Sequence, residues 1–145
     1  MRRIFASCLA NKTTLGIKSF GWNRLITNSE IRSTSSRLTL LAIPTFEPDY
    51  EENPELESFY QENFDSYLDP DLDHEFLLVI SDFKSSEMFK RFLRKYVSAR
   101  PTKAVLIDGD ERLGAYQAAN VAYMAFPHDT AGFAESDTRA RDRNW

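Results

Sequence analysis

Residues 75–81 read EFLLVIS, and this continuous apolar run decides the fold class. The run has the length of a β-strand, and its lack of polar alternation is typical of a strand buried on both faces of a parallel sheet. Two similar runs lie on either side of it in the chain: RLTLLAI at residues 37–43, which Pro44 ends, and KAVLID at residues 103–108. The sequence therefore predicts three short strands.

A helix is predicted after each of the first two strands. Asn53 is a suitable N-cap for the first helix, and Pro54 fits its first turn. The second helix has an apolar stripe between residues 88 and 97, and either Ser85 or Ser86 can cap it. Both helices are amphipathic, so each is expected to cover a face of the sheet.

A third helix is predicted after the third strand, from about residue 110 to residue 125. Asp108 is its expected N-cap, and Glu111 stands three residues later, as in a capping box. Strand and helix thus alternate three times. This order predicts an α/β fold, a small βαβαβα domain in two or three layers with a short, mainly parallel sheet.

Three regions are expected along the chain. A basic, targeting-like segment spans residues 1–36, the α/β domain spans residues 37–127, and a polar tail spans residues 128–145. Three strands make a thin sheet, so further strands are expected either from residues 1–36 or from a partner chain.

The composition excludes several classes of protein. The chain has 145 residues, a formal net charge of −4, one cysteine and two histidines, which excludes a disulfide framework and a classical zinc finger. No apolar run is long enough for a transmembrane helix. The five glycines form neither a dinucleotide-binding loop nor a P-loop. No nucleophile and base stand in a recognisable pattern, so no catalytic residue is predicted.

The basic N-terminal segment indicates a subcellular location. The first 38 residues hold seven basic residues, one acid and many serines and threonines. This composition is typical of a mitochondrial transit peptide, because a positive amphipathic segment is drawn to anionic membranes and along a negative-inside potential. We therefore expect a location in the mitochondrial matrix or on the matrix side of the inner membrane. The alternative is that the segment belongs to the fold.

Opposed charge blocks indicate protein partners. Residues 47–75 hold twelve acids and no lysine or arginine, whereas residues 84–103 have a net charge of +6. Acids on the outer face of one helix and bases on the next can steer encounters with other subunits. The partner-binding residues predicted on these faces are Glu55, Glu62, Asp65, Lys90, Arg91, Arg94 and Lys95. The same charges also fit two helices that simply pair with each other.

Carboxylates after the strands offer an alternative function. Asp82 follows the second strand, and Asp108 and Asp110 follow the third, so all three are expected at one edge of a parallel sheet. Such a group suits Mg²⁺ and phosphoryl-transfer or hydrolytic chemistry. Aspartate after a strand is also an ordinary helix cap, which explains the same residues without a metal.

The basic helix also permits binding to RNA, for example in a mitochondrial ribosome, although the acidic block would repel a polyanion. Taken together, the sequence favours a non-catalytic accessory or assembly subunit of a larger mitochondrial complex, without a cofactor. The Mg²⁺-dependent enzyme and the RNA-binding component are the alternatives.

Overall fold

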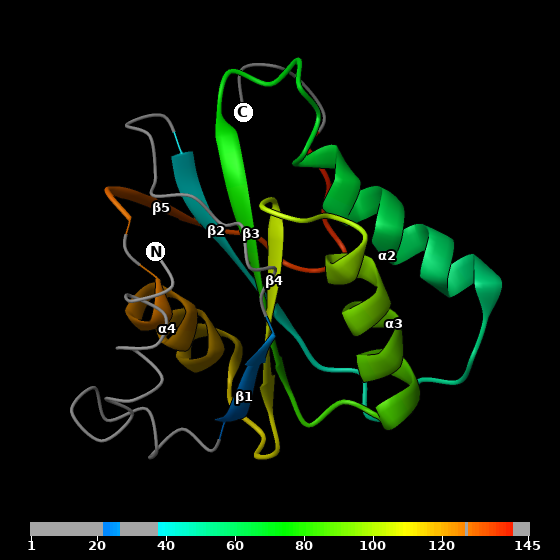
Figure 1. Cartoon of the computed structure of the whole chain (residues 1–145). Helices are drawn as coiled ribbons and strands as arrows, with labels where there is room; N and C mark the ends of the chain where they lie inside the picture. The colour runs from blue at the N-terminus through cyan, green and yellow to red at the C-terminus, as the bar shows by residue number, and fades with distance from the viewer. Residues whose placement is uncertain (1–21, 27–37, 127, 141–145) are drawn as a thin grey trace.

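The computed structural model describes residues 22–26, 38–126 and 128–140, with only the backbone described for residues 22–26 and 38. Five strands and three helices lie in these segments, and strand and helix alternate after the first strand (Figure 1). They are β1 (Trp22–Ile26), β2 (Leu38–Thr45), α2 (Pro54–Ser66), β3 (Glu75–Phe83), α3 (Glu87–Ser98), β4 (Ala104–Gly109), α4 (Ala115–Ala125) and β5 (Thr130–Phe133).

The strands form one sheet in the order β1-β4-β3-β2-β5. Strands β2, β3, β4 and β5 are parallel, and β1 runs antiparallel to β4 at one edge. The predicted α/β fold with a mainly parallel sheet is therefore confirmed. All but the first residue of β3 are buried, as its unbroken apolar run predicts.

The sheet is the middle layer of three (Figure 1). Alternate side chains of each strand point to opposite faces. Leu78 and Ile80 pack in a cluster with α2 and α3, whereas Leu77 and Val79 pack in a second cluster with α4. The two cores hold most of the apolar side chains, and the helices cover both faces of the sheet.

After β4 the chain no longer adds strands on the same side of the sheet but returns to the far side of β2. Strands β2, β3 and β4 follow one another outward, and α4 then crosses the other face and leads to β5 beside β2. In open α/β sheets, ligands bind outside the carboxyl ends of the strands at such a switch point. The strand order therefore reverses between β2 and β5, where Phe133 at the end of β5 pairs with Ala42, three residues before the end of β2.

The helix caps are partly as predicted. The Asn53 side chain accepts a hydrogen bond from the Glu55 amide at 2.9 Å, and the Ser86 hydroxyl accepts one from the Phe89 amide at 3.3 Å. The predicted cap at Asp108 is wrong, because Asp108 lies within β4 and α4 begins only at Ala115.

Two strands lie in regions that the sequence analysis assigned to extensions. β1 lies within the basic segment 1–36, so the expectation that this segment adds a strand is confirmed. The rest of that segment lies outside the described residues. β5 lies within the predicted polar tail, and it was missed because only four residues pair with β2. No described helix combines the length and the hydropathy that crossing a membrane requires.

Candidate functional site

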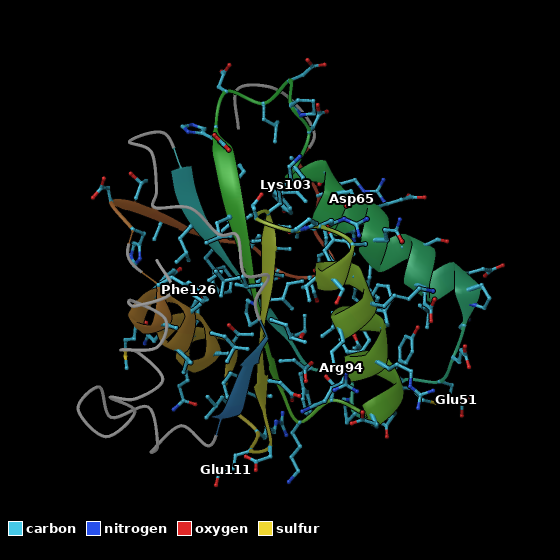
Figure 2. The ribbon with its side chains drawn as sticks, in the orientation of Figure 1. Glu51, Asp65, Arg94, Lys103, Glu111 and Phe126 are labelled. Carbon is cyan, nitrogen blue, oxygen red and sulfur yellow. The ribbon has the colours of Figure 1, made fainter. Side chains whose placement is uncertain are left out.

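The carboxyl ends of β2, β3 and β4 meet at one edge of the sheet. Strand register places Thr45 opposite Asp82, and Asp82 opposite Asp108. The sequence analysis predicted this meeting of Asp82 and Asp108 from the parallel arrangement alone. In Figure 2, Glu111, which follows β4, marks this edge, and Lys103, which precedes β4, lies toward the opposite edge.

Asp82 ties two loops together from a fully buried position. Its carboxylate accepts hydrogen bonds from the Thr45 hydroxyl at 2.7 Å and from the Ser85 hydroxyl at 2.5 Å. The Ser85 amide donates to the same carboxylate at 3.3 Å, and the Ser85 hydroxyl also accepts from the Glu47 amide at 2.7 Å. Because these bonds span the ends of β2 and β3, Asp82 fixes the loops that follow both strands.

The surroundings of Asp82 act on the pKa of its carboxyl in two opposed directions. Burial raises the pKa of the Asp82 carboxyl above its ordinary value. Hydrogen bonds from Ser85 and Thr45, and the charge of Lys90, lower this pKa and counter part of the rise. Asp82 has no exposed surface, so its role here is to organise the loops.

Lys90 lies between the two aspartates. Its ammonium is 2.5 Å from the Asp108 carboxylate and 3.7 Å from that of Asp82, and it donates to the Gly109 carbonyl at 2.6 Å. Arg94 adds a second cation, with its guanidinium 3.6 Å from Asp108. The cation that compensates the two carboxylates is thus a lysine from α3.

The magnesium expectation finds no support in this arrangement. Asp110 is exposed, whereas Asp82 and Asp108 are buried around Lys90. Within the described segments, no group of three or more histidine, cysteine, aspartate or glutamate side chains is placed to hold a metal ion. The three predicted ligands are therefore not brought together as a protein-only metal site.

The predicted partner-binding residues divide into two groups. Glu55, Glu62, Arg91 and Lys95 are exposed, as that role requires. Lys90 is buried at 8% exposure, so assigning it to a partner surface was wrong, because its charge is used inside the fold.

Asp65 and Arg94 are half-buried and pair within the chain. Asp65 accepts from the Arg100 guanidinium at 2.6 Å and 2.9 Å and from the Tyr96 hydroxyl at 2.8 Å, which joins α2 to α3 (Figure 2). Arg94 pairs with Glu87 as well as Asp108. Part of the charge pattern therefore serves pairing between the two helices.

Sequence reasoning missed two acids in the segment that follows β5. Glu135 and Asp137 directly follow β5, and both are exposed. They were read as members of a polar tail, because the short, half-exposed β5 carries no strong strand pattern. An apolar residue followed by two closely spaced acids, as in FAESD at residues 133–137, is the signal that was available.

The segment after β5 is held against the sheet and α2. The Ala134 amide donates to the Ala42 carbonyl of β2 at 3.0 Å, and the Asn63 side chain donates to the Ser136 carbonyl at 3.2 Å. Thr138 shares a hydrogen bond of 2.9 Å with the Tyr67 hydroxyl. Contacts on both sides of Glu135 and Asp137 thus give their backbone a defined position.

Tyr60 links the two sides of the switch point. Its hydroxyl donates to the carboxylate of Glu47, which follows β2. Burial raises the pKa of Tyr60, and the hydrogen bond to Glu47 and the charges of Glu47 and Asp137 raise it further. The acids that follow β2 and β5 therefore both act on one side chain of α2.

A separate hollow lies at the opposite, amino edge of the sheet. It has a volume of about 390 Å³, and its lining includes Tyr67, Asp73, His74, Phe76 and Lys103. His74 is exposed and packs its ring 6.0 Å from that of Phe76. Tyr67, which lines this hollow, also bonds Thr138 in the segment after β5, but neither Glu135 nor Asp137 lines it.

Comparison with known proteins gives a likeness in structure only. No protein-family model matches the sequence, and no curated protein matches it. A solved structure of the mannosyltransferase PcManGT from Pyrobaculum calidifontis, in complex with GDP-Man and Mn²⁺, matches with a TM-score of 0.54 and 15% identity. The match covers 98% of this chain and 41% of the mannosyltransferase, and it establishes a shared α/β fold.

Proposed function

We propose that this chain binds the diphosphate of a nucleotide sugar beside the edge strand β5 of its sheet, as the donor-binding part of a glycosyltransferase. The observation that carries the proposal is the pair of exposed acids, Glu135 and Asp137, in the segment that follows β5 and contacts α2. Exposed carboxylates are suited to a cation that accompanies a diphosphate.

The structural likeness supports this proposal. The mannosyltransferase that shares the fold was solved with GDP-Man and Mn²⁺. This chain spans 41% of that protein, so the proposal concerns donor binding, and the acceptor and the complete reaction are left open.

The donor set fits a divalent cation bound jointly with phosphate. Mg²⁺ and Mn²⁺ prefer oxygen ligands, and Mg²⁺ is commonly held by one or two carboxylates together with substrate phosphates. Glu135 and Asp137 would supply those carboxylates. A bound cation would neutralise negative charge that develops on a leaving diphosphate.

Titration calorimetry with GDP and UDP, with and without Mn²⁺, tests the proposal. We expect binding that Mn²⁺ strengthens. Glu135→Gln and Asp137→Asn should each weaken binding in Mn²⁺ by about tenfold or more, because each loses a charged ligand worth roughly 1.5–3 kcal/mol.

Two matched substitutions on another strand are the controls. Glu75→Gln and Asp73→Asn remove the same charges from exposed positions at the start of β3 and should leave nucleotide affinity unchanged. Equal weakening by the control and site variants would show a general charge effect and would refute the site. Absence of nucleotide binding by the wild-type chain would refute the function.

A second proposal is that the chain is an accessory or assembly subunit of a larger mitochondrial complex. It is favoured by the surface where α2 and α3 meet. Exposed Met88 lines a small hollow there, with Glu52 and Glu57 on one side and Arg91 and Lys95 on the other. An apolar centre with charged margins of both signs suits a protein partner.

The native mass of the protein in gently solubilised mitochondria tests this second proposal. Migration in a large particle with stoichiometric partners, lost on Met88→Glu, is the expected result. Migration at monomer size, or absence of the protein from mitochondria, would contradict it.

A further inference from the structure

The outer surface where α2 and α3 meet carries charges of both signs in an ordered arrangement. A hollow of about 130 Å³ there is lined by Glu52 and Glu57 on the α2 side and by Arg91 and Lys95 on the α3 side. The two helices lie side by side on one face of the sheet, and each leads from the carboxyl end of one parallel strand to the amino end of the next (Figure 1). The helices are therefore parallel, and an acidic row runs beside a basic row.

The fold leaves these four charges without ion pairs. None of them pairs with an opposite charge within the part of the chain that the structure describes. Three of them are exposed, and Glu57 is half-buried. Farther along the same two helices, by contrast, Asp65 and Arg100 pair at 2.6 Å. The four charges are thus available to a partner.

An apolar side chain lies in the same hollow. Met88 is 42% exposed, and the ring of Phe92, which is 7% exposed, also lines the hollow. Methionine is flexible and polarisable, so it adapts to an opposing apolar group. The apolar area that Met88 offers is small, and it suits a weak, reversible association better than an obligate one.

The charge pattern of this surface is complementary to itself. A two-fold axis in the contact plane, parallel to the two helices, places the acidic row of each copy opposite the basic row of the other. All four charges of each copy then face an opposite charge. An axis that passes beside Met88 also brings the methionines of the two copies together. A two-fold pair of this kind uses the same patch on both subunits, and it is the commonest form of oligomer.

We propose that this surface binds a second copy of the chain and forms a weak two-fold dimer. The inference rests on the second proposed function only in treating the surface as one that binds protein. Opposite charges fix the alignment, because a shifted or inverted pair would place like charges against each other at a cost in free energy. Salt screens exposed charges, so the dimer weakens as the ionic strength rises.

Sedimentation velocity of the full chain, over a range of protein concentrations, tests the inference. The wild type should form a concentration-dependent dimer. Glu52→Lys with Glu57→Lys makes the surface wholly basic, and Arg91→Glu with Lys95→Glu makes it wholly acidic. Each double variant should raise the dissociation constant of its own dimer by about a hundredfold or more, because the symmetry turns every charge contact across the axis from attraction into repulsion.

A mixture of the two double variants gives the decisive result. Each alone should be monomeric, but the wholly basic surface of one is complementary to the wholly acidic surface of the other. An equimolar mixture should therefore form a heterodimer. Circular dichroism checks that each variant is folded. Met88→Glu is a further variant that changes no buried residue, and it should abolish the wild-type dimer because two like charges meet near the axis.

Two charge reversals elsewhere on the surface are the matched controls. Glu75→Lys and Lys103→Glu change exposed residues at the start of β3 and just before β4. Each should leave the dimer unchanged. Weakening as large as that caused by the double variants would show a general charge effect and would overturn the inference.

The remaining outcomes separate the inference from the second proposed function. A wild-type chain that stays monomeric, or a mixture of the two double variants that stays monomeric, overturns the dimer. If the monomeric chain still migrates in a large mitochondrial particle that Met88→Glu disrupts, another protein occupies the surface and the second proposed function stands. A dimer of the purified chain, with no such particle in mitochondria, supports the inference and contradicts that function.

Discussion

Lys90→Met is expected to lower the free energy of unfolding by about 3 kcal/mol at neutral pH, because it leaves buried carboxylates without their central cation. The Lys90 ammonium lies 2.5 Å from Asp108 and 3.7 Å from Asp82. Methionine fills the space of the lysine stem, so the loss reports charge rather than a cavity. Chemical denaturation followed by circular dichroism measures it.

The pH dependence identifies the cause of this loss. Burial already raises the pKa of Asp82, and Lys90 is one of the groups that counter the rise. Removal of Lys90 raises the folded-state pKa of Asp82 further above its unfolded value. An acid whose pKa is higher in the folded state is disfavoured when ionised, so the deficit grows as pH rises through that range and shrinks in acid.

Lys95→Met on the same helix is the matched control. Lys95 is exposed, so the same chemical change should alter stability by about 0.5 kcal/mol or less. A deficit in Lys90→Met that does not change between neutral and acidic pH would rule out the electrostatic explanation. A loss no larger than that of Lys95→Met would show that the buried cation contributes nothing.

Gly109→Ala is expected to destabilise the fold by about 3 kcal/mol through overpacking. A Cβ at residue 109 would lie 2.0 Å and 2.3 Å from two ring atoms of Phe83, whose side chain is 1% exposed. The Gly109 carbonyl also accepts from Lys90 and from the Lys84 amide, so displacement would disturb both contacts. Denaturant titration measures the loss.

A double-mutant cycle tests the assigned clash. In a Phe83→Ala background, Gly109→Ala should cost little, because the ring that it strikes is gone. Gly114→Ala is the control, since its nearest contact would be an ordinary 3.5 Å to the Gln117 side chain, and it should change stability by about 1 kcal/mol or less. An equal cost of Gly109→Ala in both backgrounds would place its effect elsewhere.

The predicted and observed sites differ in one instructive way. Asp82 and Asp108 were expected together at the strand ends, and the register confirms it. Their expected Mg²⁺ is replaced by Lys90, which the charge pattern of α3 placed on the outer face. Helical periodicity assigns each residue to the inner or the outer face of a helix. It does not reveal that a long lysine side chain can reach a carboxylate 18 residues away, past the end of a strand.

Glu135 and Asp137 show the opposite difficulty. Their chemistry is plain in the sequence, but their importance depends on β5, whose four residues include one large apolar side chain. That strand exists because its backbone pairs with Thr39 to Ala42 of β2, about 90 residues earlier. No local pattern encodes such pairing, so the acids after it were assigned to a tail.

The sequence by itself determined the alternation of strands and helices, the parallel direction of the main strands and the burial of β3. These features follow from local periodicity and from continuous apolar runs, which act over a few residues. Only the tertiary structure decided the return of the chain to β2, the switch point there, and the pairing of Lys90 with two aspartates. These depend on hydrogen bonds and charges between distant segments, whose free energy is set by the burial that folding itself creates.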